Sequence, residues 1–316
     1  MDLASHNSSI DANDFDKVVN KLRLFFKSKG FLEVHTQHRL SILAACEDPG
    51  TISLYNYGGE VWPLPQTGQM WLEYEMLKNP ENPGYFCVST SYRNEPNPIE
   101  GRHNLIFPMF EFEMKGGYEE LIEMEKELLS YLGYNNHIEK EYMDIVEQYK
   151  SFELSHEHEQ QLYKDCGPVC FLEKFPTFTS PFWNMRRFED SRYAKKIDVI
   201  LSGMETIGSA ERSCDVDAMR ETFNTISNGE YAKLLYSKFG KERVEKELEE
   251  FLSLNFIQRS GGGIGITRLI SSMKKENLLE LNNDVILEIE NKASELGDSK
   301  YLHRGDNESR STPCTM

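Results

Sequence analysis

The sequence of 316 residues lacks any apolar run that approaches the ~20 residues a helix needs to cross a bilayer. Its first residues, MDLASHNSSIDANDFD, are polar and acidic, so no secretory signal is expected there. The six cysteines form no C-x-x-C pair and follow no regular spacing, which argues against a disulfide framework. These absences predict reduced thiols in a cytoplasmic protein without a membrane partner.

Positive charge is also scarce. The chain has 52 acidic and 35 basic residues, and its formal net charge is −17. A protein that holds nucleic acid by neutralising phosphates is expected to be basic, at least locally. No dense lysine and arginine cluster with interleaved aromatics occurs, and the strongest doublet is Arg186–Arg187. The composition therefore disfavours nucleic acid as a partner.

Standard nucleotide-binding loops are missing from the one glycine-rich stretch, SGGGIGITRLI at 260–270. It lacks the Lys-Ser/Thr that follows the last glycine of a P-loop, and it lacks G-x-G-x-x-G. Four glycines within five residues still indicate a close approach between the main chain and a ligand or a neighbouring element. The arginine that follows them, Arg268, needs another explanation.

Hydrophobic periodicity predicts a mixture of helices and strands. Apolar residues recur at helical spacing from Phe15 to Phe26, with Asp14 as the expected N-cap and Gly30 as the expected end. Further helices are predicted at 67–78, 118–132, 138–150, 155–165 and within 216–254, with a last one ending near Leu296. Strands are predicted at 31–34, 85–94, 107–114, 168–173, 196–202 and 204–212. We expect a flexible segment at 1–13, one domain at 14–296, and a disordered polar tail at 297–316.

The strands at 85–94 and 107–114 are separated by a polar loop and predict a long hairpin. On the first strand Arg93 shares a face with Ser91 and Glu95, and on the second Glu111 and Glu113 share a face with Phe107 and Met109. A half-buried sheet with a solvated side would explain the alternation. It does not explain why Arg93 and the Arg102–His103 pair bracket the loop.

Taken in order, these segments resemble the catalytic domain of class II aminoacyl-tRNA synthetases. The most similar group is the aspartyl and asparaginyl subgroup with its relative, ammonia-dependent asparagine synthetase. Residues 15–36 resemble the first family motif, although Gln37 stands where the family has proline. The second motif, R-x-E, a loop, then R-H-x-x-x-F, corresponds to Arg93, Glu95, Arg102, His103 and Phe107. GIGITR, from Gly263 to Arg268, matches the third motif. The resemblance implies an α+β fold with an antiparallel sheet flanked by helices.

Bent ATP is the nucleotide that the resemblance implies. Arg93 would stabilise the five-coordinate α-phosphorus, and Glu95 would accept a hydrogen bond from the adenine amino group. Phe107 would stack on one face of the adenine base. Arg268 would cover the other face of the base and reach the γ-phosphate. Arg102 and His103 would also hold the γ-phosphate. The glycines, Gly263 and Gly265 among them, would let the strand pass close under the nucleotide.

The resemblance also implies a magnesium site and an amino-acid subsite. Asp198 and Glu205 have the spacing of the family's metal carboxylates, which suit Mg²⁺. Gly208 replaces a serine that often assists the metal, leaving Ser209 or water to substitute. The family's amino-acid contacts would fall on Glu47, Gln66, Thr67, Gln69 and Arg212. Leu72 and Glu211 depart from the lysine and glutamine of aspartyl enzymes, so an asparagine-like substrate, a reoriented aspartate and a different dicarboxylic amino acid all stay open.

True aspartyl and asparaginyl enzymes carry an anticodon-binding barrel of roughly a hundred residues before the first motif. That motif begins near residue 14 here, so we expect adenylation without tRNA transfer. Free ammonia is then the leading nucleophile, and asparagine, AMP and pyrophosphate are the products. Ligation to another amine, a stand-alone tRNA aminoacylase and a non-catalytic sensor of ATP or amino acid are the alternatives. The family pairs through its first motif, which predicts a homodimer.

Overall fold

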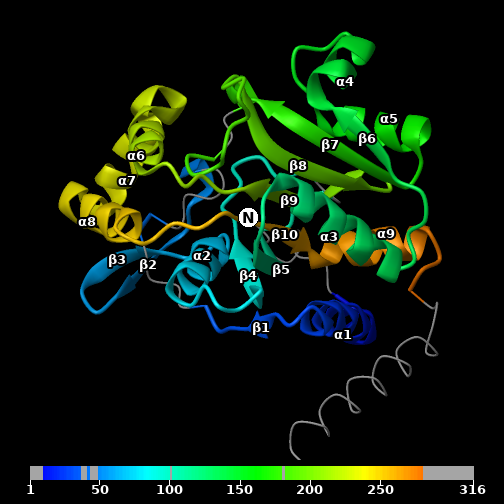
Figure 1. The fold of residues 1–316 in the computed structure, drawn as a ribbon, viewed down its shortest axis with the longest axis horizontal. Coiled ribbons are helices and arrows are strands. Elements are labelled where there is room, and N and C mark those ends of the chain that lie inside the picture. The colour runs from blue at the N-terminus through cyan, green and yellow to red at the C-terminus, as the bar shows by residue number, and fades with distance from the viewer. Residues whose placement is uncertain (1–9, 37–40, 43–48, 100–101, 180–181, 280–316) are drawn as a thin grey trace, which may run out of the picture. The chain divides into compact units, whose positions relative to one another are not determined.

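The computed structural model describes residues 10–36, 41–42, 49–99, 102–179 and 182–279. Within them one sheet of eight strands dominates, in the order β1-β4-β5-β10-β9-β8-β7-β6 (Figure 1). The β1–β4 and β6–β7 pairs are parallel and the other pairs in it are antiparallel. Its strands are β1 Leu32–Glu33, β4 Gly84–Tyr92, β5 Ile106–Lys115, β6 Ile138–Glu141, β7 Val169–Pro176, β8 Tyr193–Leu201, β9 Met204–Glu211 and β10 Arg259–Gly265. A separate hairpin joins β2 Leu54–Tyr57 and β3 Glu60–Pro63.

Helices cover both faces of the sheet. One face packs against α1 Ala12–Ser28, α3 Tyr118–Tyr131 and α9 Ile266–Lys275, which share an apolar core with alternate residues of the strands. The other face carries α2 Gln69–Lys78. The remaining helices are α4 Tyr142–Tyr149, α5 His156–Cys166, α6 Val216–Thr225, α7 Glu230–Phe239 and α8 Lys241–Leu252, with short 3-10 turns at Pro49–Thr51, Thr177–Thr179 and Ile226–Gly229. The predicted α+β class is confirmed.

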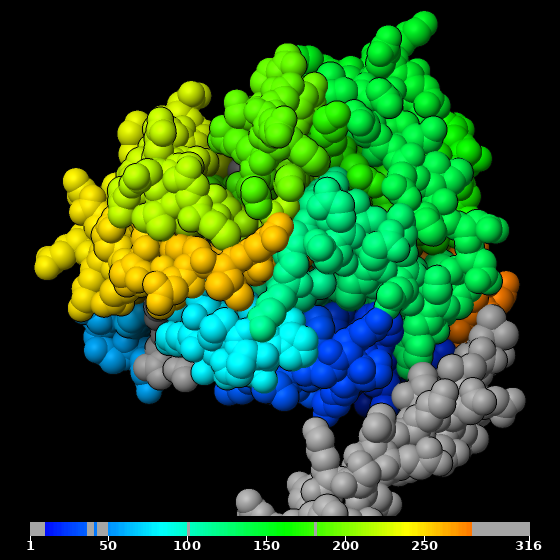
Figure 2. Space-filling model, viewed as in Figure 1, coloured from blue at the N-terminus to red at the C-terminus, as the bar shows by residue number. Residues whose placement is uncertain are grey.

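A second apolar cluster joins α2, α6, α7 and α8 around the buried Trp183. Its aromatic side chains meet edge to face, with ring centroids 5.4 Å apart for Trp183 and Phe223 and 5.9 Å apart for Trp183 and Phe251. The space-filling view shows the yellow α6–α8 segment at one end of the visible face and the green α4–α5 segment at the other (Figure 2). No helix in the described part of the chain combines the length and the apolar character needed to span a membrane.

Most predicted elements are present, with two corrections. The first helix begins at Ala12 rather than after Asp14, because the Asp11 carboxylate accepts hydrogen bonds from the Asn13 and Asp14 amides. The segment 138–150 is not one helix: its first four residues pair with β7 as a strand, and only 142–149 is helical. The predicted end of the last helix, near Leu296, lies outside the described residues, as does the expected polar tail.

A buried carboxyl group lies between α3 and the sheet. The Glu125 side chain is fully buried beside the Ser209 side chain. Burial, helped by the negative charges of Asp198 and Glu173, raises the pKa of Glu125 to about 8. The folded protein therefore holds a proton here over a pH range in which the unfolded chain has released it.

Glu125 should make the folded state less stable as pH rises. A raised carboxyl pKa contributes stability that is complete below the unfolded value of 4.5 and is lost as pH approaches about 8. Between those values we expect wild type to lose about 1.4 kcal/mol per pH unit relative to Glu125→Gln. Urea unfolding of both proteins at several pH values measures the difference. A difference that does not change with pH would show that the group ionises normally.

Candidate active site

A cavity of about 340 Å³ opens on the face of the sheet opposite α1, α3 and α9. Strand pairing places residues of β8, β9, β10 and β5 side by side on this face in rows, because directly paired residues of antiparallel strands point to the same side. The row Asp198–Gly208–Gly263–Glu111 lines the cavity, and beside it is the row Lys196–Ala210–Gly261–Glu113, of which only Lys196 lines the cavity. Each row has charged side chains at its ends and only glycine or alanine between them. The floor of the cavity is therefore main chain.

The glycines of β10 are required by close packing as well as by the cavity. A Cβ on Gly261 would collide with the Glu113 carboxylate and the Phe112 carbonyl. A Cβ on Gly262, on the other face, would lie 2.6 Å from Ser209 Cβ, and one on Gly263 would lie 2.8 Å from Met109 Cε. Gly265 is different, because a Cβ there would make ordinary contacts with Arg268. Close approach to neighbouring strands explains Gly261, Gly262 and Gly263, and the predicted approach to a nucleotide stays a prediction.

The structure brings together all but two of the predicted site residues. Those that line the cavity are Thr67, Gln69, Arg93, Glu95, Arg102, His103, Phe107, Asp198, Glu205, Arg212, Gly263, Gly265 and Arg268. Gln66 is buried next to it and donates a hydrogen bond to Thr51 Oγ1. Glu47 lies outside the described residues. The hairpin strands pair Ser91 with Phe107, so the charged faces of β4 and β5 form one surface.

Cationic side chains surround His103 at one end of the cavity. The Arg93 guanidinium carbon lies 5.6 Å from the centroid of the Phe107 ring. Arg268 donates a 2.7 Å hydrogen bond from Nη1 to the Glu205 carbonyl, and Arg102 pairs with Glu159 on α5. Burial, with the positive charges of Arg102, Arg268 and Arg93 and against the charge of Glu95, lowers the pKa of His103. This end suits a polyanion.

Two carboxylates face the same small space above Gly208. A Cβ on Gly208 would lie 3.3 Å from Glu205 Oε1 and 3.6 Å from Asp198 Oδ1. Asp198 Oδ1 is buried and accepts no hydrogen bond from the described residues, while Oδ2 lies 2.7 Å from Lys196 Nζ. An unsatisfied buried oxygen beside a second carboxylate fits Mg²⁺. No cluster of three or more metal-binding side chains occurs among the described residues, so phosphate oxygens and water would complete the coordination.

Ser209 does not take the place of the missing serine at 208. It pairs with Ile197 on the core face of the sheet and lies beside Glu125, away from the two carboxylates. The alternation of side chains along β9 gives the physical reason, since residues 208 and 209 must point to opposite faces. Ser209 also contributes to the lining of the cavity, but its side chain lies beside Glu125, and the part expected of water stays a prediction.

The other end of the cavity is held by Glu111, which sequence reasoning did not select as a site residue. Its buried carboxylate accepts hydrogen bonds from Thr67 Oγ1, Ser89 Oγ and the Gly68 amide, the last at 2.8 Å. The carboxylate thus lies at the N-terminus of α2 and fixes the segment that carries Thr67 and Gln69. The sequence contained a signal for Glu111, because it shares one strand face with Met109 and Glu113.

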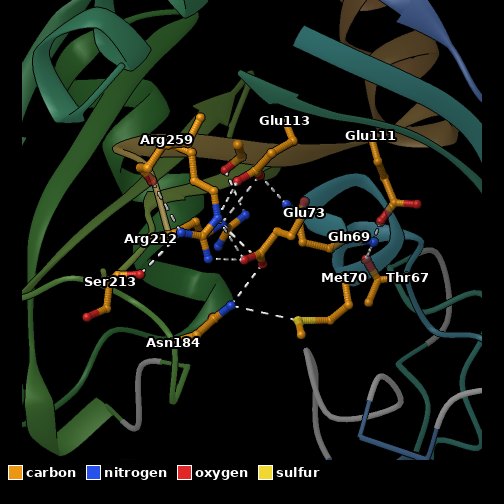
Figure 3. A network of polar contacts seen from close by, with 12 residues as sticks. Thr67, Gln69, Met70, Glu73, Glu111, Glu113, Asn184, Arg212, Ser213 and Arg259 are labelled. Carbon is orange, nitrogen blue, oxygen red and sulfur yellow. Dashed lines mark hydrogen bonds and ion pairs between the residues drawn. The ribbon is translucent and has the colours of Figure 1, made fainter. Parts of the chain in front are cut away.

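A buried network of opposite charges surrounds Arg212 (Figure 3). Arg212 Nε lies 3.5 Å from Glu113 Oε2 and 3.7 Å from Glu73 Oε1, and Nη2 donates to the Gly261 carbonyl at 3.1 Å. Arg259 Nη2 lies 2.6 Å from Glu73 Oε2, and both of these side chains are fully buried. Asn184 and Gln69 donate further hydrogen bonds to the two carboxylates. The two arginines and two glutamates have formal charges that cancel.

Comparison with known proteins identifies the chain's relatives. A family model described as tRNA synthetases class II (D, K and N) matches residues 1–281, most of the chain. The chain belongs to this family. No curated protein matches the sequence.

Solved class II synthetases have the same fold at low sequence identity. Asparaginyl-tRNA synthetase from Pyrococcus horikoshii, complexed with asparaginyl-adenylate, is 18% identical with a TM-score of 0.68, over 85% of this chain and 65% of that one. The Entamoeba histolytica asparaginyl-tRNA synthetase, also with asparaginyl-adenylate, is 16% identical with a TM-score of 0.66, over 84% and 64%. A putative aspartyl-tRNA synthetase from Leishmania major Friedlin is 16% identical with a TM-score of 0.65, over 86% and 62%. The chain spans less than two thirds of each relative's length.

Two residues that depart from the class II synthetase pattern, Leu72 and Glu211, do not line the cavity. Leu72, where aspartyl enzymes have lysine, is fully buried with Met76, Tyr85 and Cys87 and does not line the cavity. It therefore packs α2 against the sheet. Glu211, where the pattern has glutamine, pairs with Arg186 at 2.6 Å and with Lys195 at 2.7 Å on the core face. Neither departure selects an amino acid by direct contact in the cavity.

Proposed function

We propose that this class II synthetase relative adenylates the carboxylate of aspartate or a close analogue and then forms an amide with ammonia. The products would be asparagine, AMP and pyrophosphate. One observation supports the first step most strongly: Arg93 and Arg268 line a single cavity together with Glu95, Phe107 and the Asp198–Glu205 pair. The arrangement provides cations for phosphates, an aromatic ring for a base and carboxylates for a metal.

In the first step a substrate carboxylate oxygen attacks the α-phosphorus of ATP, and the bond to the β-phosphate oxygen breaks. Arg93 would stabilise negative charge on the α-phosphate oxygens as the five-coordinate state forms. Arg268, with Arg102 and His103, would hold the leaving pyrophosphate. Asp198 and Glu205 would hold Mg²⁺, which neutralises phosphate charge when bound. Arg102 must exchange Glu159 for phosphate, because it pairs with Glu159 here.

In the second step the amine nitrogen attacks the acyl carbon of the adenylate. The bond to the AMP phosphate oxygen breaks, AMP leaves, and the amine loses a proton to give the amide. Thr67, Gln69 and Arg212 would orient the amino acid for both steps, since all three line the cavity beside Glu111 and Glu113. Glu47 would pair with the substrate ammonium group.

Glu113 is expected to make substrate affinity depend on pH. Burial, the largest cause, together with the charge of Glu73, raises the pKa of Glu113 against the opposing charges of Arg212 and Arg259. While Glu113 is protonated, the network carries a net positive charge that matches a second substrate carboxylate. As pH rises through the raised pKa, the ionised Glu113 competes for Arg212, and the KM for aspartate should rise by up to about ten-fold per pH unit.

The variant Glu113→Gln keeps the shape of the side chain and removes the ionisation. Its KM for aspartate should therefore stay nearly level where the wild-type KM rises. Pyrophosphate exchange measured from about pH 6 to about pH 9 provides the comparison. Parallel pH profiles for the two proteins would exclude Glu113 as the titrating group.

ATP–pyrophosphate exchange across all amino acids, with products read by mass, tests the proposed function. Aspartate should support exchange, and ammonium should convert the adenylate to asparagine with release of AMP. Exchange without amide formation would remove ammonia as acceptor, after which candidate amines and tRNA can be added in turn. Nucleotide binding without exchange for any amino acid would favour a sensor and contradict an enzyme.

The assembly and the compartment are also part of the proposal. A homodimer formed through α1 and β1 is expected by analogy with the family's first motif, and light scattering measures it. A reducing compartment such as the cytoplasm agrees with the four cysteines of the described residues, all of which are free. For tRNA, the net charge of −17 predicts weak binding that falls steeply with salt.

A further inference from the structure

Lys196 is a cavity-lining cation that the steps above leave without a role. It lies two residues before Asp198 on β8, and the two side chains point to the same face of the strand. Lys196 Nζ lies 2.7 Å from Asp198 Oδ2 and 3.8 Å from the centroid of the Phe175 ring. An ion pair on one side and a ring face on the other hold the ammonium group in place.

The Lys196 side chain lines the cavity, and its paired neighbours on the adjacent strands are small. Lys196 is paired with Ala210, and the next residue in the row is Gly261, so its two neighbours across the strands have no long side chain. Its side chain is 24% exposed. The two carboxylate oxygens of Asp198 have different neighbours. Oδ2 accepts a hydrogen bond from Lys196 Nζ, and Oδ1 faces the space above Gly208.

We infer that Lys196 supplies a fixed positive charge for the nucleotide's phosphates beside the metal carboxylates, so that nucleotide binding tolerates loss of the divalent cation. This inference rests on the proposed binding of ATP in the cavity. An ammonium tethered to Asp198 stands next to the place where the divalent cation would bind, and it remains there when the metal is removed. Its positive charge would then act on the same phosphate oxygens.

In the alternative role, Lys196 neutralises the buried Asp198 carboxylate and does not contact the nucleotide. The two roles predict different results when the metal is removed. If Lys196 contacts phosphate, its loss weakens nucleotide binding most in EDTA. If it only neutralises Asp198, its loss weakens metal-free binding through the unpaired carboxylate, and the double variant Lys196→Met/Asp198→Asn restores that binding; if Lys196 contacts phosphate, the double variant stays weak.

The test is equilibrium binding of α,β-methylene-ATP, which cannot be cleaved at the reacting bond, by calorimetry in EDTA and in excess Mg²⁺. Lys196→Met should weaken binding in EDTA by at least about ten-fold, or about 1.4 kcal/mol, and by much less in Mg²⁺. Lys196→Arg should restore metal-free binding. Lys174→Met, on the neighbouring strand and paired with Glu141, removes an equal charge outside the cavity and should match wild type in both conditions.

The possible outcomes separate this inference from the proposed function. Wild type that binds no nucleotide in either condition overturns both. Wild type that binds in Mg²⁺ and loses nearly all affinity in EDTA overturns the inference alone. So does an equal effect of Lys196→Met in the two conditions. Circular dichroism and the unfolding midpoint of Lys196→Met establish that the variant is folded before binding is measured.

Discussion

Alanine in place of Arg93 is expected to abolish ATP–pyrophosphate exchange while the protein stays folded. The guanidinium group would stabilise charge that develops on the α-phosphate only in the transition state, and removal of one such donor costs about 10² to 10³ in rate. Arg93 follows the last residue of β4, and its main-chain amide donates to the Leu105 carbonyl at 2.8 Å. Alanine keeps that backbone hydrogen bond. Exchange rates and the urea midpoint together measure both parts of the expectation.

A matched control for Arg93→Ala is Arg192→Ala. Arg192 pairs with Asp190 at 2.7 Å, its side chain is 78% exposed, and it does not line the cavity. Its loss should leave exchange unchanged within about two-fold, because exposed ion pairs contribute little. An Arg93→Ala protein that exchanges pyrophosphate as fast as this control would refute the role assigned to Arg93.

Methionine in place of Arg259 should destabilise the protein by about 3 to 5 kcal/mol, because it leaves buried carboxylates without their partner. Arg259 is fully buried, bonds to Glu73 through Nε and Nη2 at 3.2 and 2.6 Å, and stacks 5.0 Å from the centroid of the Phe256 ring. Its Nη1 also donates to the Ser213 carbonyl at 3.2 Å. Urea or thermal unfolding measures the loss.

Two further variants make the Arg259 result specific. Arg220→Met breaks an exposed pair with Glu249 at 2.8 Å and should cost less than about 1 kcal/mol. The double variant Arg259→Met/Glu73→Met should recover much of the loss, since apolar groups often replace a buried ion pair at little cost. If the double variant is as unstable as the sum of the singles, packing of Arg259 rather than its charge explains the effect.

The fold could be predicted largely because its strands and helices carry strong periodicity. The first helix, the hairpin at 85–114 and the β8–β9 pair were all expected from spacing, and the structure contains them. The misassigned segment at 138–141, IEKE, has no local alternation of apolar and polar residues. It is a strand because it pairs with β7, a contact between residues about thirty positions apart in the sequence.

The cavity could be predicted only where family motifs cover it. Arg93, Glu95 and Arg268 belong to motifs, and all three line it. Lys196 and Glu111 are not among the residues that the motifs assign to the site, although Lys196 lies two residues before Asp198 and Glu111 shares a strand face with Phe107. The Arg259–Glu73 pair joins residues far apart in the sequence, and no local pattern brings them together.

The decisive measurement is a structure of the protein with ATP and an unreactive aspartate analogue. We expect one bent nucleotide, with Arg93 within hydrogen-bonding distance of the α-phosphate and Arg268 against the base and the γ-phosphate. The analogue's carboxylate should lie in line with the α-phosphorus. A nucleotide bound elsewhere, or one that leaves either arginine facing away from it, would show that this cavity is not the adenylation site.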